Sequence, residues 1–373
     1  MMLSDTFLTH FATLKEPRLQ NHNFRHRLSD ILIIAILGTI CGADGWVEIE
    51  RFGIAKQSWL NTFLELPNGI PSHDTFGRVF SLLDPKVFGE CFSAWIASLT
   101  IDLTREVIAL DGKTVRGSGN KRQGQSPLHL VSAWAAKSRL MLGQVRTEHK
   151  SNEVTAIPKL LNLLDIAGSV VTIDAMGCQT KIAKVIRAQD ADYVLALKEN
   201  QKTLFDNVQS IFARAEENKQ KQYKHILHRR KIERIKDHGR VETRKYTLLS
   251  ARDPLLFELR WPGLQGIGKL EVIRTTHHQV ERSIRYFITS LAYEEIDSFM
   301  KTVRSHWKIE IDCHWSLDVS FREDLSQVRI GHAAENLARI RRIALNLLKQ
   351  EKTHIKMASP VAGKRQGGIT NIC

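Results

Sequence analysis

Two short runs of apolar residues, each followed directly by an aspartate, constrain the fold of this 373-residue chain more than any other feature. Residues 107–110 (VIAL) precede Asp111, and residues 170–173 (VVTI) precede Asp174. Continuous apolar runs of this length are typical of strands that are buried on both faces. Helical patterns separate these runs from each other and from a third run at residues 193–197. The sequence therefore predicts a mixed α/β sheet with helical crossovers.

The pattern changes along the chain. Residues 1–104 carry apolar side chains at helical spacing, without strand-like alternation. The Asp111-Gly112 pair is expected to end the strand at 107–110. Strand-like pieces at 128–136 and 140–145 join the predicted sheet. Three more strand-like pieces, at 241–249, 269–276 and 283–291, follow a basic stretch, and a single helix is expected over 294–314. We therefore expect a helical N-terminal domain (1–104), an α/β core (105–200 and 294–350), a basic β-rich insertion (201–293) and a loose, atypical tail (351–373).

The charge of the chain predicts a polyanionic partner. There are 54 Lys and Arg residues against 40 Asp and Glu, which gives a net charge of +14. Residues 219–246 alone hold 11 basic residues against three acids. Nucleic acid is the first expectation for such a surplus, and an anionic membrane surface is the second. The longest apolar run, residues 31–43, is too short to span about 30 Å of hydrocarbon, so no membrane association is expected. Five widely spaced cysteines without a CxxC motif favour the cytoplasm.

The aspartates that end the two buried runs are candidate metal ligands. The carboxyl ends of parallel strands form the sheet edge where ligand sites are built, and carboxylates are the oxygen ligands that divalent cations prefer. Glu310 offers a third acid, flanked at four-residue spacing by His306 and His314. Each feature also has an ordinary alternative: an aspartate capping a turn, an exposed polar stripe on a helix, or a His/Glu/His zinc site without the compact HExxH spacing.

Several longer motifs resemble one family. The segments LDGKTVRGS (110–118), KSNEVTAIP (150–158), TIDAMGCQ (172–179), DYVLALK (192–198) and RSHWKIEIDCHWSLD (304–318) are similar, in this order, to bacterial DDE transposases of the H-repeat-associated insertion-sequence group. LPNGIPSHDTF (66–76) resembles the helical domain that precedes the catalytic core in that group. The resemblance covers roughly residues 25–350.

The resemblance implies a ribonuclease-H-like core in which Asp111, Asp174 and Glu310 form the DDE triad. It also implies two Mg²⁺ ions, with Mn²⁺ as a substitute, and cleavage and strand transfer at the terminal inverted repeats of an insertion sequence. The expected partner is double-stranded DNA, at transposon ends and target, bound by a homodimer. The expected location is the bacterial cytoplasm, in association with the nucleoid.

A further set of polar residues near these motifs is expected to contact DNA. The candidates are Lys113, Arg116, Lys198, Asn200, Gln201, Arg229, Arg230, Lys231, Arg240, His306 and Lys308. For each of them an ordinary solvated side chain is the alternative, and core packing is the alternative to base stacking for Trp307 and Trp315.

Two alternatives to an active transposase remain open. The chain has Ile311 and Cys313 where the group usually has Asn and Leu, and its ending after about Met357 differs from that of the group. A catalytically inactive remnant that only binds DNA would explain these departures. A ribonuclease-H-like nuclease without strand transfer is the second alternative.

Overall fold

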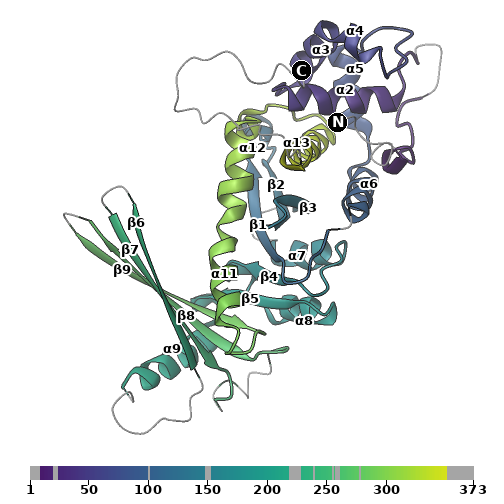
Figure 1. Ribbon diagram of the computed structural model, residues 1–373. Coiled ribbons are helices and arrows are strands. Elements are labelled where there is room, and N and C mark those ends of the chain that lie inside the picture. Colours follow the sequence, from purple (N-terminus) through teal and green to yellow (C-terminus); the bar gives the residue numbers. More distant parts are fainter. Residues whose placement is uncertain are drawn as a thin grey trace.

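A single nine-stranded sheet organises the computed structural model (Figure 1). The structure describes residues 9–19, 24–99, 101–147, 153–217, 228–237, 240–253, 256, 261–276 and 279–350. The tail at 351–373 and the first part of the 150–158 motif lie outside the described residues. The strands are ordered β3-β2-β1-β4-β5-β9-β8-β7-β6.

Five strands make up the core of the sheet. Strands β1 (Val107–Val115), β2 (Leu128–Ala135) and β3 (Leu140–Thr147) are antiparallel neighbours. Strands β4 (Val170–Ile173) and β5 (Asp192–Leu197) run parallel to β1, and helices α7 (Glu153–Leu161) and α8 (Thr180–Ala188) make the connections. The predicted mixed α/β core, an antiparallel pair followed by parallel crossovers, is confirmed.

The strand end expected at Asp111-Gly112 is wrong, because β1 continues to Val115. Pairing of β1 with β4 stops at Leu110 and Ile173, whereas pairing with β2 continues as far as Val115 and Leu128. The neighbouring β2 thus satisfies the backbone groups that an Asp-Gly turn would have left unpaired. Asp111 is still the first residue beyond the parallel pairing.

Four long strands extend the sheet and form what we call the arm: β6 (His228–Asp237), β7 (Arg240–Ser250), β8 (Gly266–Thr275) and β9 (Val280–Thr289). Helix α9 (Lys202–Glu217) precedes them. Strand β9 pairs antiparallel with β5, so the arm and the core share one sheet. Strand β6 was not predicted, because this edge strand has no buried side chain among its described residues and its sequence shows no apolar alternation.

Helices surround the other end of the core. The N-terminal region contains α2 (Leu28–Ile40), α3 (Trp46–Ala55), α4 (Gln57–Leu60), α5 (His73–Leu82) and α6 (Pro85–Ser98), which confirms its helical character. The C-terminal helix α13 (Ala333–Gln350) packs against α2, α5 and α6 as well as against β3. None of the described helices combines the length and the apolarity that a membrane span needs.

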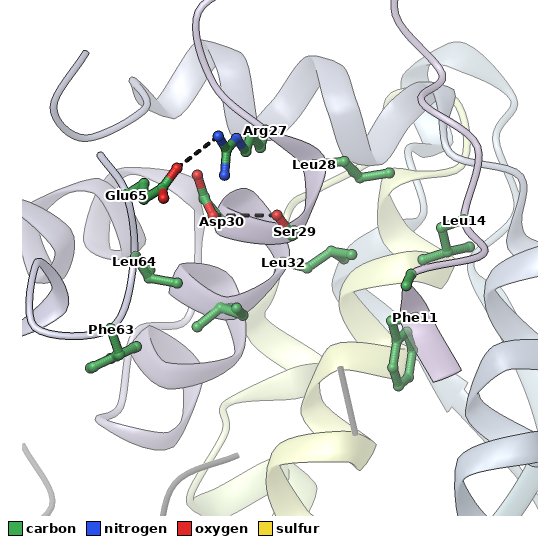
Figure 2. Close-up of a pocket in the computed structure, with 12 residues that line it drawn as sticks. Phe11, Leu14, Arg27, Leu28, Ser29, Asp30, Leu32, Phe63, Leu64 and Glu65 are labelled. Carbon is green, nitrogen blue, oxygen red and sulfur yellow. Dashed lines mark hydrogen bonds and ion pairs between the residues drawn. The ribbon is translucent and has the colours of Figure 1, made fainter. Parts of the chain in front are cut away.

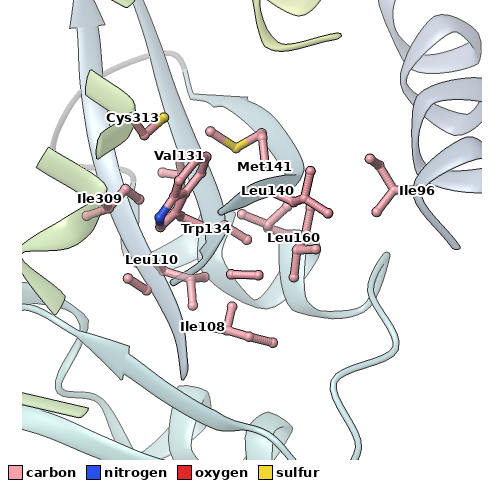
Figure 3. Close-up of a cluster of buried hydrophobic side chains, with 14 of the residues drawn as sticks. Ile96, Ile108, Leu110, Val131, Trp134, Leu140, Met141, Leu160, Ile309 and Cys313 are labelled. Carbon is pink, nitrogen blue, oxygen red and sulfur yellow. The ribbon is translucent and has the colours of Figure 1, made fainter. Parts of the chain in front are cut away.

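The single helix expected over 294–314 is divided in the structure. It consists of α11 (Ile296–His306), a π-helical turn (Ile309–His314) and α12 (Trp315–Val319). The π turn, a rare form that is frequent at functional sites, contains Glu310. Ile309 and Cys313 from this turn point to the buried cluster around Leu110 and Trp134 (Figure 3). Cys313 therefore serves the packing of the π turn on the sheet.

Candidate active site

Asp111 and Asp174 lie side by side at the point where the parallel pairing of β1 with β4 ends. Each is the first residue beyond the last pair between β1 and β4. Asp111 Oδ1 accepts a hydrogen bond from its own neighbour, Gly112 N, at 2.8 Å. Asp174 Oδ1 accepts hydrogen bonds from Met176 N at 3.0 Å and Gly177 N at 3.2 Å, so this side chain also caps the short 3₁₀ turn that follows β4.

The pKa of Asp111 depends on its burial and on the charges of the other two predicted acids. Burial, together with the negative charges of Glu310 and Asp174, raises the pKa of Asp111 from 3.8 to about 7, and the hydrogen bond from Gly112 opposes this rise. Glu310 and Asp174 therefore act electrostatically on Asp111. Glu310 itself is exposed to solvent on the π turn.

Two histidines flank Glu310 on the inner side. His314 Nδ1 lies 3.5 Å from Asp111 Oδ2, and burial lowers the pKa of His314 to about 3, with further contributions from Arg342 and Lys113. Burial also lowers the pKa of His306. Both imidazoles are therefore neutral at neutral pH. His306 Nδ1 and His314 Nε2 are buried without a hydrogen-bond partner.

The donor chemistry of the site fits a hard divalent cation. The charges of Glu310 and Asp174 oppose the ionisation of Asp111, and bound positive charge would relieve this repulsion. Within the described residues, no three His, Cys, Asp or Glu side chains stand close enough together to hold an ion as they are placed. The carboxylates would thus have to approach one another on binding. The same observation gives the His306/Glu310/His314 zinc alternative no support.

A fourth acid, Glu153, lies against Gly112, next to Asp111, and no role was predicted for it. The buried Glu153 Oε1 lies 2.6 Å from His129 Nε2, and His129 Nδ1 lies 2.8 Å from Thr114 Oγ1. A β-carbon at Gly112 would collide with the Glu153 carboxylate, so the glycine permits this close approach. Glu153 also raises the pKa of Asp111. The only sequence signal was its place in the motif at 150–158.

Lys113, predicted to contact DNA, is buried in the structure. Its side chain is 7% exposed, and Nζ lies 2.6 Å from Asp318 Oδ1 and 3.2 Å from Asp324 Oδ1. Arg116 is exposed, and its Nε lies 3.3 Å from Asp324 Oδ2. Lys113 thus ties the strand that carries Asp111 to the segment that follows Glu310, which favours a structural role over a phosphate contact.

Asn200 and Gln201 hold the loop after Asp174. Asn200 Nδ2 donates to Ala175 O at 2.6 Å, and Gln201 Nε2 donates to Cys178 O at 3.0 Å. Lys198 is exposed and lines, together with Asp174, Met176 and others, a pocket of about 600 Å³. Lys198 remains free to meet a phosphate beside Asp174, whereas the two amides position the loop.

The remaining DNA candidates lie on several surfaces. In strand β6, Arg229 and Lys231 point to one face and Arg230 to the other. Lys231 forms an ion pair with Asp297 of α11, and Arg229 lies over the Tyr293 ring at 6.0 Å. Arg240 at the start of β7 and Lys308 before the π turn are exposed, whereas His306 faces inward.

A second pocket, of about 560 Å³, lies in the N-terminal helical region (Figure 2). Its lining is largely apolar, with Phe11, Leu14 and Leu32 around the buried Asp30, and burial raises the pKa of Asp30. Arg27 and Glu65 form an ion pair at 2.7 Å across its rim. It contains none of the predicted site residues.

Comparisons with known proteins find matches over most of the chain. Residues 102–347 match the family model described as "Transposase DDE domain", and residues 8–96 match the model described as "DDE_Tnp_1-associated". The "H repeat-associated putative transposase YhhI" of Escherichia coli K12 is 37% identical over 350 residues, covering 92% of this chain and 90% of that protein. The "Inactive transposase YbfQ" of the same strain is 48% identical over 56 residues, covering 15% of this chain and 67% of that protein. The piggyBac transposase synaptic complex with hairpin DNA aligns with a TM-score of 0.40 and 9% identity, covering 92% of this chain and 71% of that chain, and no conclusion rests on it.

Proposed function

Because the chain belongs to the transposase DDE domain family, we propose that it binds the terminal inverted repeats of its own insertion sequence and catalyses metal-dependent DNA cleavage and strand transfer. The observation that supports this proposal is the position of Asp111 and Asp174 side by side where the parallel pairing of β1 with β4 ends, with Glu310 acting electrostatically on Asp111. Double-stranded DNA is then the partner, bound by a homodimer in the cytoplasm, in association with the nucleoid.

Asp111, Asp174 and Glu310 would hold the divalent cations, Mg²⁺ or Mn²⁺. When bound, two such cations supply activation of a water molecule and stabilisation of the leaving 3′ oxygen. The neutral His314 imidazole, 3.5 Å from Asp111, orients this carboxylate without competing for it as a cation. Asn200 and Gln201 fix the backbone that follows Asp174. In strand transfer the freed 3′-hydroxyl takes the place of water, so the same residues serve both reactions.

The proposal is tested by nicking of a supercoiled plasmid that carries the DNA flanking the coding region. We expect the wild type to nick the plasmid in Mg²⁺ or Mn²⁺. Asp174→Asn and Glu310→Gln should each nick at least about a thousandfold more slowly, because each removes a negative charge that balances the cations. Affinity for the same DNA should stay within a few-fold. A variant that nicks at the wild-type rate would remove its residue from the proposed triad.

The same assay separates the two alternatives. A wild type that binds the plasmid and never nicks it is the inactive remnant that Ile311 and Cys313 suggested. Ile311 is 66% exposed and Cys313 is buried in the core packing, so neither substitution removes a carboxylate from the site. A wild type that nicks but gives no joined products on a target plasmid is a nuclease without strand transfer.

A further inference from the structure

The arm projects beyond the sheet edge that carries the acids. Pairing of β9 with β5 begins at Thr289 opposite Val194 and ends at Tyr286 opposite Leu197, the last residue of β5. Residues 280–285 of β9 therefore extend past the carboxyl end of β5, on the side of Asp111 and Asp174. In Figure 1 the distal ends of β6, β7 and β9 point away from the core.

Helix α11 identifies which face of the arm belongs to the active site. The Phe299 ring of α11 lies 5.6 Å from that of Phe287, and Asp297 pairs with Lys231. The strand registers place four arginines on this same face, which we call the inner face. They are Arg285, Arg244, Arg274 and Arg240, in order of increasing distance from β5.

The innermost of these arginines reaches the catalytic segment. Arg285 Cζ lies 4.8 Å from the centroid of the Trp307 ring, three residues before Glu310. Arg274 and Arg244 both repel Arg285 electrostatically, so three guanidinium groups lie near one another. A row of like charges at this spacing raises the positive potential where an anionic backbone would pass.

A buried acid orients the middle of the row. Glu242, whose side chain is 6% exposed, lies 2.6 Å from Arg244 Nε and 2.9 Å from Arg274 Nε. Engagement through Nε leaves the terminal nitrogens of Arg274 directed to an outside acceptor, and guanidinium forks suit phosphate oxygens. Arg244 is the more enclosed of the two, with Glu233 also 3.8 Å away.

We propose that Arg240, Arg274 and Arg285 form a phosphate-binding row for duplex DNA that leads to the acids, with Glu242 as the residue that positions it. Successive arginines from Arg285 to Arg240 lie two residues apart along the strand direction. The three intervals together span about 20 Å, which is the length of about six base pairs of duplex. The inference rests on the proposed function for its ligand, and it adds the DNA path. The outer face of the arm also carries exposed arginines, Arg230, Arg234 and Arg282, but these point away from α11 and the π turn.

The test compares two matched triple variants of the full chain: Arg240→Ala/Arg274→Ala/Arg285→Ala on the inner face and Arg230→Ala/Arg234→Ala/Arg282→Ala on the outer face. Each removes three exposed arginines, one of them in an ion pair with a buried glutamate. Fluorescence anisotropy with a labelled 30-base-pair duplex, from 50 to 200 mM salt, gives the slope of log K against log salt. The inner triple should flatten this slope by about 2.7 and weaken binding at least about tenfold at 50 mM. The outer triple should match the wild type.

The variant Arg240→Lys/Arg274→Lys/Arg285→Lys should keep the wild-type slope of log K against log salt, because it keeps all three positive charges. The thermal midpoints of both Ala triples should match, which excludes unfolding as the cause. Three results would each overturn the inference. The outer triple could flatten the slope as much as the inner triple, the inner triple could leave the slope unchanged, or the wild type could fail to bind the duplex. A wild type that shows the expected binding difference but never nicks DNA would overturn the proposed cleavage alone.

Discussion

Glu323→Gln is expected to lower the free energy of unfolding by about 3–5 kcal/mol, since it breaks a fully buried ion pair. Glu323 and Arg342 are both fully buried, and their side chains meet through two contacts, at 2.5 and 3.3 Å. Without the carboxylate, the Arg342 guanidinium would stay buried with no opposite charge, beside the buried Arg341. Urea unfolding at pH 7 measures the loss.

The double variant Glu323→Leu/Arg342→Met provides the control. Removing both charges leaves no unpaired ion, so we expect the double variant to be more stable than Glu323→Gln. A double variant that loses as much as the sum of both single variants would show that the pair is not the source of the effect. The pair matters for the site because Asp324, the next residue, holds Lys113 and through it the strand of Asp111.

Asp111→Asn is expected to stabilise the metal-free protein, by an amount that grows with pH. Burial and the charges of Glu310 and Asp174 raise the pKa of Asp111 from 3.8 to about 7 in the folded state. As the pH rises from about 4, the unfolded chain ionises first, so the folded wild type loses stability until about pH 7 and then levels off. Three pKa units correspond to about 4 kcal/mol.

Urea unfolding in a chelator at pH 4, 6 and 8 checks this sign. The stability of Asp111→Asn relative to the wild type should increase by about 4 kcal/mol between pH 4 and pH 8. Asp206→Asn, at an exposed position of α9, serves as the control and should show no such trend. A difference between Asp111→Asn and the wild type that is constant across the pH range would contradict the placement of Asp111 among like charges.

The strands of the core were predictable because they are short and apolar throughout. Val170–Ile173 is a strand with the predicted bounds, and the parallel neighbours follow from the helices between them. The end of β1 was not predictable in this way. Asp111-Gly112 has the local chemistry of a turn, and only the continued pairing with β2, more than 15 residues along the chain, keeps it extended.

Asp111 and Asp174 were candidates because each follows an apolar run, and Glu310 because of its helical spacing to His306 and His314, but the surroundings of these acids were not predictable. The approach of Glu153 and His129 to Gly112 depends on side chains from α7 and β2, which no local pattern connects. The π turn at Glu310 has no sequence signature of its own either. The charge of Lys113 was visible, but its burial between Asp318 and Asp324 depends on the tertiary fold.

Direct titration of Mn²⁺ into the full chain tests the central claim, that Asp111, Asp174 and Glu310 together form a divalent-cation site. Isothermal calorimetry at pH 7.5 should show about two ions bound per wild-type chain. Asp111→Asn, Asp174→Asn and Glu310→Gln should each lose at least one of them. Asp318→Asn, which changes a nearby acid paired with Lys113, should bind Mn²⁺ as the wild type does. Triad variants whose titrations overlay that of the wild type would contradict the account and place the cations elsewhere.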